Sequence, residues 1–350
     1  MRRGEATGLK AAGLALGALA ALSLLHAPAE EAGRLTMAGN ATACPTLTTP
    51  TDQCLTVTAN YPANLGLGNL LFYYASLEGI AAANGKPAFF PVNIPFHPFD
   101  VFELGPVTVR NFILGKRTQI LQEEASARFL PQALHLPCQV HVVLEGYWQS
   151  WRYFAPQMAS LRARLTDGFR PDIAYACAAR IREALFGLGK LRRSAVHLVG
   201  IHARRGDFTH ASAQQYGFAP AKESFLRQAL AYFHQRHAAS GSQKRLVFLL
   251  LGNDPEWTRT ALANHTLPDA PVLEPSKEAG VDLCVLSRSD EHGISSGSFG
   301  WWAAFIGGGH TIYQAEYARP NSTLFQRIEP DDYFLPHWLP LDENSSLPMY

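Results

Sequence analysis

The chain has 350 residues, of which 47% are hydrophobic and 17% charged, and its formal net charge is +1. This composition excludes an intrinsically disordered chain, and the charge gives no electrostatic argument for binding nucleic acid. Because one hydrophobic core usually stops growing at roughly 250–300 residues, the length favours two domains with a cleft between them.

The first 28 residues have the pattern of a targeting segment. Arg2, Arg3 and Lys10 precede an uncharged run over 11–25, which is short beside the ~20 residues that usually span a bilayer. Small residues around Pro28 also suit a signal peptidase, so a cleavable signal peptide stays open as the alternative to a signal anchor. We expect the anchor, with its basic end cytoplasmic.

Residues 29–54 are rich in Thr, Ala, Pro and Gly without apolar periodicity, and we expect a stem there. Four Asn-x-Ser/Thr triplets suit N-glycosylation in the lumen. Five cysteines lack the close paired spacing of a zinc site, so some of them pair as disulfides if the compartment is oxidising, while five buried free thiols are the alternative. The triplets begin at Asn40, Asn264, Asn321 and Asn344, and the cysteines are Cys44, Cys54, Cys138, Cys177 and Cys284.

Ordered structure is expected to begin with a strand at 55–59, a glycine loop at 66–69, a helix over 70–83 and a strand at 88–90, with Gly85 ending the helix. This order opens a parallel α/β unit. The loop Gly66-Leu67-Gly68-Asn69 lacks the third glycine of a dinucleotide fingerprint and the Gly-Lys-Ser/Thr end of a P-loop. Its amides face an anion or a sugar, or it is simply a tight strand-to-helix turn.

The same order restarts at a nearly unbroken apolar run over 195–201, which predicts a strand buried on both faces. Further elements of the unit are a helix over 222–237, a strand over 246–251 and a helix over 256–263. The sequence therefore predicts an α/β fold with two Rossmann-like domains, 55–190 and 191–350, and a ligand cleft at the carboxyl ends of the second sheet.

The run ends in the motif His202-Ala203-Arg204-Arg205-Gly206-Asp207. Guanidinium groups bind diphosphate oxygens in bidentate fashion and keep their charge. Adjacent side chains leave a loop in different directions, so one arginine can bind a phosphate while the other pairs with Asp207 or another acid. A structural ion pair is the alternative to a phosphate site.

A second candidate anion cradle is Ser295-Ser296-Gly297-Ser298-Phe299-Gly300-Trp301-Trp302, a turn before a helix that runs to about residue 306. We expect Trp301 and Trp302 in the core, with stacking on a sugar or base as the alternative. The sequence has no Asp-x-Asp triplet and no cluster with metal-ligand spacing. Without a metal ion, the negative charge of a diphosphate would be neutralised by arginine side chains and backbone amide dipoles.

Together these motifs resemble those of the galactoside α1,2-fucosyltransferases, the blood-group H type, over roughly residues 56–340. The matching stretches follow one another in the family's order. They are 66–69 with 84–89, 199–208, 298–304, 311–313 and 334–338.

The resemblance implies a GT-B-type fold, with an acceptor side in the first domain and GDP-fucose binding in the second. It implies an inverting, metal-independent enzyme that needs no cofactor. L-fucose would pass from GDP-β-L-fucose to the 2-hydroxyl of a terminal β-galactose on glycans. It also implies a single-pass type II protein of the Golgi membrane with a lumenal catalytic part.

Carried over by position, the resemblance makes Arg204, His202 and Asp207 the catalytic residues, with Arg204 on the β-phosphate. Asp282 resembles the acid that recognises the guanine edge. The other donor contacts implied are Arg205, Gly68, Asn69, Asn253, Asp254, Ser296, Gly297, Ser298 and Phe299.

The chain departs from the family opening at Leu67 and Leu70, where the family has Arg and Gln. A protein O-fucosyltransferase shares the arginine loop and the donor, although the tail at 334–338 favours the galactoside branch. A non-catalytic lumenal sugar-binding protein of the same fold is a further alternative, indicated only by the two leucines. The general base is not identified, since Asp207 and His202 can each serve as base or orient the arginine loop.

Overall fold

A computed structural model describes most of the chain from residue 65 onward. Its described residues are 33–34, 57–60, 65–91, 98–104, 109–110, 118–138, 140–263 and 269–342. The fold is α/β, as expected, with two parallel sheets.

No helix in these ranges is long and apolar enough to cross a membrane. The prediction of a single-pass Golgi membrane protein was therefore wrong, because no described helix offers the ~20 apolar residues that a span requires. The segment 1–28, to which the anchor was assigned, lies outside the described residues, as does the stem at 29–54 apart from 33–34.

The first sheet has six strands in the order β1-β5-β6-β2-β3-β4, and every neighbouring pair is parallel. Its strands are β1 (Gly33–Arg34), β2 (Val57–Asn60), β3 (Ala88–Pro91), β4 (Val109–Arg110), β5 (Thr118–Gln122) and β6 (His141–Glu145).

The second sheet has five parallel strands in the order β11-β10-β9-β7-β8. Strand β7, which lies between β9 and β8, is buried along nearly its whole length, and this burial on both faces explains its apolar sequence. The strands are β7 (Val196–Ala203), β8 (Arg245–Gly252), β9 (Glu291–Ile294), β10 (Thr311–Gln314) and β11 (Leu339–Leu341).

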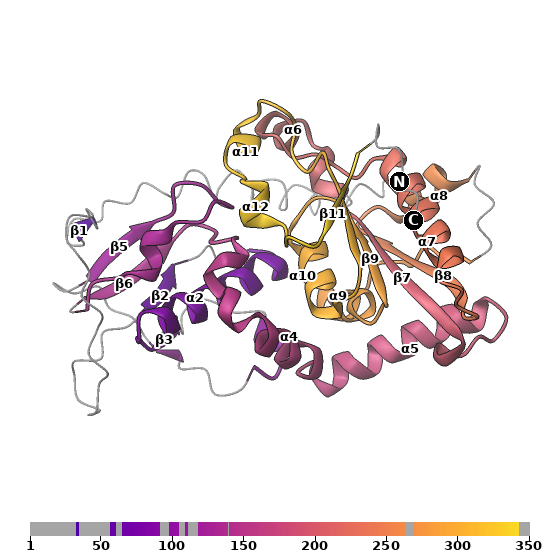
Figure 1. Ribbon diagram of the computed structural model, residues 1–350, viewed down its shortest axis with the longest axis horizontal. Coiled ribbons are helices and arrows are strands. Elements are labelled where there is room, and N and C mark those ends of the chain that lie inside the picture. Colours follow the sequence, from indigo (N-terminus) through magenta and orange to yellow (C-terminus); the bar gives the residue numbers. More distant parts are fainter. Residues whose placement is uncertain are drawn as a thin grey trace, which may run out of the picture.

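Helices connect and cover both sheets (Figure 1). The α-helices are α2 (Leu67–Ala83), α3 (Pro98–Val101), α4 (Met158–Asp167), α5 (Pro171–Gly187), α6 (Ala211–Tyr216), α7 (Glu223–Ala239), α8 (Pro255–Leu262), α9 (Ala279–Ser287), α10 (Ser298–Gly307), α11 (Thr323–Gln326) and α12 (Pro330–Tyr333). The 3₁₀ helices are η1 (Pro131–Leu134), η2 (Trp151–Gln157), η3 (Arg193–Ala195) and η4 (Gly206–Thr209).

The two sheets lie towards opposite ends of the long axis, with α2 and α10 between them (Figure 1). An aromatic cluster joins these helices: the Phe72 ring lies 4.6 Å from Trp301 and 5.1 Å from Trp302, centroid to centroid. Both tryptophans are fully buried, and Trp301 Nε1 donates to the carbonyl of Tyr333. Their expected place in the core is confirmed.

A disulfide joins α5 to α9 through Cys177 and Cys284, whose Cα atoms are 5.9 Å apart. Cys138 is also disulfide-bonded. The alternative of five free thiols is therefore wrong. Cys44 and Cys54 lie outside the described residues.

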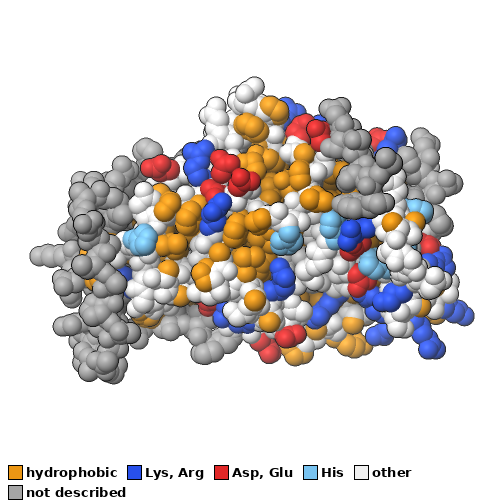
Figure 2. Space-filling view, in the orientation of Figure 1, with side chains coloured by type: hydrophobic (Ala, Val, Ile, Leu, Met, Phe, Trp, Pro, Cys, Tyr) orange, Lys and Arg blue, Asp and Glu red, His pale blue; other side chains and the backbone are white. Residues whose placement is uncertain are grey.

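Charge is mixed over the described part of the surface in Figure 2, where basic and acidic side chains lie beside one another in several places. This pattern agrees with the net charge of +1. An anionic ligand would therefore need a local arrangement of donors, since the described surface in Figure 2 offers no broad positive face.

Candidate functional site

The arginine motif stands at the carboxyl end of β7, at the edge where open parallel sheets bind ligands. The strand runs two residues further than expected, so His202 and Ala203 belong to it and the loop begins at Arg204. The Arg204 amide donates to Ser295 Oγ at 2.8 Å. Its guanidinium pairs with Asp207 at 2.7 Å and lies 5.1 Å from the centre of the Phe208 ring. Asp207 and Phe208 thus orient a guanidinium that stays about one-third exposed.

Arg205 points elsewhere. Its guanidinium lies 3.8 Å above the Trp257 ring and donates to the carbonyl of Ala221 at 2.7 Å. Its Nε is 3.6 Å from Asp254. These contacts hold Arg205 against α8, away from Arg204.

Asn253 and Asp254 support the same loop from the end of β8. Asn253 Oδ1 accepts the Arg205 amide at 2.8 Å, and Asp254 Oδ1 caps α8 by accepting the Trp257 amide at 3.1 Å. Each side chain therefore has a structural role beside the predicted nucleotide pocket.

His202 packs against the start of α10, in the motif Ser295–Trp302. The side chain is only 5% exposed, and its ring centre is 5.2 Å from that of Phe299. A Cβ on Gly300 would come within 2.8 Å of Nδ1. Burial, and secondarily the Arg204 charge, lowers the pKa of His202 to about 3. The imidazole is neutral and packs against the start of α10.

The turn Ser295–Gly297 lies directly beside Arg204. A Cβ on Gly297, where φ is +105°, would lie 3.9 Å from Arg204 Cγ and 3.7 Å from Phe208. Ser296 Oγ is buried, and among the described residues it has no hydrogen-bond partner. An unpaired buried hydroxyl in this turn is an available donor for an anion.

The N-terminus of α2 meets the N-terminus of α10 at this point. A Cβ on Gly68 would lie 2.7 Å from the Phe299 amide nitrogen, so only glycine permits this approach. Ser298 Oγ donates to Asn69 Oδ1 at 2.5 Å. The stretch 67–69 is the first turn of α2 and not a loop before it, and the glycine serves a close approach of two helices.

Two helix N-termini therefore converge beside Arg204. Each N-terminus carries the equivalent of roughly +0.5 charge and unpaired amide donors. The arrangement brings together the predicted residues Arg204, Asp207, Gly68, Asn69, Gly297, Ser298 and Phe299. Its chemistry suits a diphosphate.

Asp282 lies in the first turn of α9 and is 8% exposed. Its Oδ1 accepts from Arg180 Nη1 at 2.7 Å, and its Oδ2 accepts from the Ser276 amide at 2.8 Å. Burial raises its pKa, although the Ser276 amide and Arg180 act in the opposite direction. Both carboxylate oxygens are engaged within the chain.

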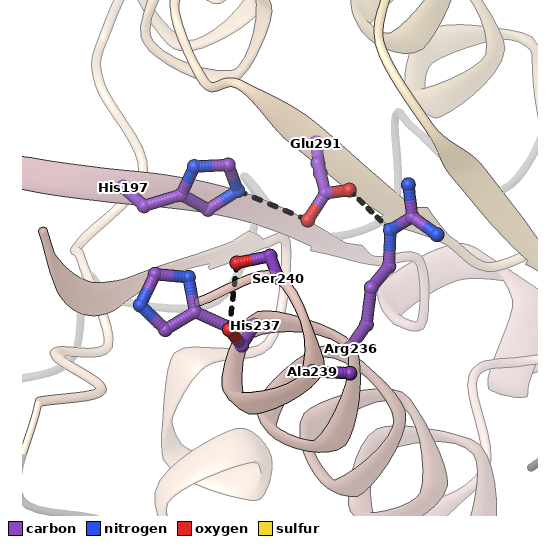
Figure 3. Close-up of a pocket in the computed structure, with 6 residues that line it drawn as sticks. All are labelled: His197, Arg236, His237, Ala239, Ser240 and Glu291. Carbon is purple, nitrogen blue, oxygen red and sulfur yellow. Dashed lines mark hydrogen bonds and ion pairs between the residues drawn. The ribbon is translucent and has the colours of Figure 1, made fainter. Parts of the chain in front are cut away.

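A pocket of about 360 Å³ opens at the opposite edge of the second sheet, where β7 and β9 begin (Figure 3). His197 Nε2 is 3.0 Å from Glu291 Oε2, and Arg236 Nε is 2.6 Å from Glu291 Oε1. None of the predicted donor-site residues lines this pocket. Across the described ranges, no group of three or more His, Cys, Asp or Glu side chains is placed to hold a metal ion.

Of the four predicted glycosylation sites, Asn321 is described. It is exposed, and its φ of +61° places it in a turn. Asn40, Asn264 and Asn344 lie outside the described residues.

Two residues at the site were missed from the sequence. Gln149 Nε2 donates to Asn69 Oδ1 at 2.8 Å, and Glu123 holds the turn that carries Gln149 through the amides of Tyr147 and Trp148. The available signal was Gly146 and polar residues directly after the apolar stretch Val142–Leu144, the pattern of a parallel strand that ends at a ligand edge.

Comparison with known proteins agrees with these motifs. The family model "Glycosyl transferase family 11" matches residues 34–342. Galactoside alpha-(1,2)-fucosyltransferase 2 of Bos taurus is 28% identical over 291 residues, which cover 78% of this chain and 76% of that protein. Galactoside alpha-(1,2)-fucosyltransferase 1 of Saimiri boliviensis boliviensis is 27% identical over 293 residues, which cover 80% and 73%.

Among solved structures, fucosyltransferase NodZ from Bradyrhizobium aligns with a TM-score of 0.46 and 14% identity, over 72% of this chain and 93% of that chain. The glycosyl transferase family 9 protein from Veillonella parvula aligns with a TM-score of 0.47 and 12% identity, over 84% and 88%. The family match over 34–342 confirms the resemblance inferred from the motifs, and the chain belongs to glycosyl transferase family 11.

Proposed function

We propose that this chain transfers L-fucose from GDP-β-L-fucose to the 2-hydroxyl of a terminal β-galactose on glycans. The names of its relatives, galactoside alpha-(1,2)-fucosyltransferases, support the donor sugar, the acceptor and the linkage. The observation that carries the proposal is the convergence of Arg204 with the N-termini of α2 and α10 at the carboxyl edge of the second sheet. A nucleoside diphosphate is the part of this donor that such a site binds.

The proposed reaction inverts the anomeric carbon. Galactose O2 forms a bond to fucose C1 while the bond from C1 to the β-phosphate oxygen breaks. GDP departs with the electron pair of that bond, and the hydroxyl proton passes from O2 to solvent water. Negative charge grows on the β-phosphate in an oxocarbenium-like transition state. Arg204, held in place by Asp207, stabilises that charge where it develops.

His202 and Asp207 act by positioning in this proposal. His202 is neutral and packed under Gly300, so it supports the start of α10 and does not meet the acceptor. Asp207 orients Arg204. The arginine and the amide dipoles provide the positive charge, and we propose that neither a metal ion nor a cofactor takes part.

Donor binding is assigned to both halves of the chain. Ser296, Gly297, Ser298 and Phe299 would bind the diphosphate, together with Gly68 and Asn69 from α2. Arg205, Asn253 and Asp254 would shape the nucleotide pocket through the contacts they make with one another. Asp282 would recognise the guanine edge, for which Arg180 would have to release one of its carboxylate oxygens.

We further propose that the two sheets mark two Rossmann-like domains of a GT-B-type enzyme, 55–190 on the acceptor side and 191–350 on the donor side. The parallel order of each sheet supports this division. The contact of α2 with α10 would then lie at the domain boundary.

An acceptor assay tests the proposal. GDP release from GDP-fucose is measured with lactose, and separately with a folded protein domain that offers Ser or Thr, and the linkage and anomeric configuration of the product are read by NMR. We expect release with lactose and an α1,2-linked product. Release only with the protein domain would identify a protein O-fucosyltransferase, and GDP-fucose binding without release would identify a sugar-binding protein.

A further inference from the structure

Glu123 is a buried acid that the proposed reaction leaves unused. It follows β5 directly, at the carboxyl edge of the first sheet, and its amide donates to the carbonyl of Glu145 at 2.7 Å. The side chain is 4% exposed. Carboxyl groups are almost never buried to this degree unless they are paired or have a specific role.

Its carboxyl group holds a tight turn. Glu123 Oε2 accepts the Tyr147 amide at 2.5 Å and the Trp148 amide at 2.9 Å. A Cβ on Gly146, where φ is +141°, would come within 2.6 Å of the same oxygen. Trp148 has φ of +53°, a conformation that costs a bulky L-residue free energy and persists only when its surroundings impose it.

This turn leads directly to the donor site. Gln149 follows Trp148 and donates from Nε2 to Asn69 Oδ1 at 2.8 Å, and the same oxygen accepts Ser298 Oγ at the start of α10. Ser76 Oγ, on α2, donates to the Trp148 carbonyl at 2.7 Å. The carboxyl group of Glu123 is therefore three hydrogen-bonded steps from the N-terminus of α10.

From these contacts we infer that Glu123 is a positioning residue for the donor site: its carboxyl group clamps the turn Gly146–Gln149 and thereby holds Gln149 against Asn69 beside α10. The inference rests on the proposed use of this site for GDP-fucose. Loss of the clamp frees Trp148 from its left-handed conformation, withdraws Gln149 from Asn69 and loosens the contact between the N-termini of α2 and α10.

Ionisation of Glu123 acts on the same clamp. Burial raises its pKa to about 8, against the opposing effects of the Trp148 and Tyr147 amides and of Arg327. The groups whose charges interact with it are Arg327, Tyr73, Tyr147 and Tyr153. Glu123 Oε1 has no hydrogen-bond partner among the described residues. Because the carboxyl group ionises more easily when it is exposed, rising pH favours opening of the turn over its closed form.

The test measures the affinity for GDP and GDP-fucose by calorimetry, and it measures turnover with lactose separately. The variants are Glu123→Gln and Glu123→Ala. The matched control is Glu124→Gln, which changes the exposed neighbouring residue. Glu123→Gln keeps an oxygen for both amides and is expected within about threefold of wild type at pH 7. Glu123→Ala is expected to weaken donor affinity about tenfold or more. The control stays at wild-type values.

Two further readouts separate positioning from a general loss of stability. Wild-type donor affinity is expected to fall as pH rises from about 5 to about 8, between the ordinary pKa of a carboxyl group and the raised pKa of Glu123, whereas Glu123→Gln loses that dependence. In a double-mutant cycle the effects of Glu123→Ala and Gln149→Ala on GDP affinity should be less than additive, since both break the same relay. If Glu123→Ala does not fold, the GDP affinity of Gln149→Ala and the pH profile of Glu123→Gln still test whether Glu123 positions the donor site.

Any one of three results would overturn the inference. The first is a folded Glu123→Ala protein with wild-type GDP affinity. The others are additive effects in the double-mutant cycle and a pH profile that Glu123→Gln leaves unchanged. Failure of the proposed function is distinct: the wild type would then bind GDP and respond to Glu123 substitutions, but form no fucosylated galactoside.

Discussion

Arg204 and Arg205 are neighbours in sequence with different environments. Their side chains point in different directions. Arg204 lies against Asp207 and Phe208, whereas Arg205 stacks on Trp257. Arg205 also donates from Nη1 to the carbonyl of Ala221, and an arginine that is stacked and hydrogen-bonded in this way holds a loop in place. We therefore propose that Arg204, and not Arg205, contacts the phosphates, and that Arg205 supports the loop that presents Arg204.

Replacing Arg204 should lower turnover far more than it weakens acceptor binding. Arg204→Ala is expected to lower kcat by about 10²–10³, the typical cost of losing one preorganised donor to developing charge, with the KM for lactose changed only a few-fold. Arg227→Ala, which removes an exposed ion pair with Glu223 on α7, is the matched control and should behave as wild type. Steady-state kinetics measure both, and near-normal turnover in Arg204→Ala would refute the assignment.

At the scale of elements, the site depends on how closely α2 and α10 approach. Gly68→Ala would place a Cβ 2.7 Å from the Phe299 amide nitrogen, and backbone on both sides prevents an easy adjustment. A shift of about 1 Å in such a site can cost roughly 10²-fold in rate, so we expect kcat/KM for GDP-fucose to fall at least tenfold.

Gly66→Ala is the control for that experiment. Gly66 is the N-cap of α2, its φ is −67°, and a Cβ there would have nothing within 4 Å. Donor kinetics of the two variants are compared under the same conditions. Equal effects at both positions would mean that the contact of α2 with α10 does not govern donor binding.

The disulfide between α5 and α9 should contribute strongly to stability. Cys177 and Cys284 are separated by 107 residues, and a loop of this length corresponds to roughly 4.7 kcal/mol in the chain-entropy description, within a usual range of about 2–5 kcal/mol. The double variant Cys177→Ala/Cys284→Ala should lose this much unfolding free energy in urea titrations. Reductant should destabilise the wild type and affect the variant less; a loss below about 1 kcal/mol would contradict the prediction.

The sequence predicted the second sheet better than the first, for reasons visible in particular elements. β7 and β8 are long and apolar, so their ends, and the arginine motif between them, could be placed within two residues. β5 and β6 are five residues each, with polar or partly exposed ends, and were not recognised. Contacts between distant positions, such as Gln149 with Asn69, 80 residues apart, depend on packing that no local pattern encodes.

At the scale of the whole molecule, the candidate donor site draws on both sheets. β7 and β9 supply Arg204 and the turn Ser295–Gly297, while α2 and the segment after β6 supply Asn69 and Gln149. A ligand that contacts both halves should hold them together. Binding of the donor is therefore expected to stabilise the entire fold and not one half of it.

Donor binding and the proposed independence of metal can be measured together. GDP at about 100 times its Kd should raise unfolding free energy by about 2.7 kcal/mol if it binds only the folded chain, seen as one cooperative upward shift of Tm. In the proposed site Arg204 and two helix N-termini supply the positive charge. The shift should therefore be the same with EDTA and with added Mg²⁺ or Mn²⁺, and turnover with lactose should persist in EDTA. Arg204→Ala should lose much of the shift. A Tm response or turnover that needs added metal would show that the charge of the diphosphate is neutralised in another way.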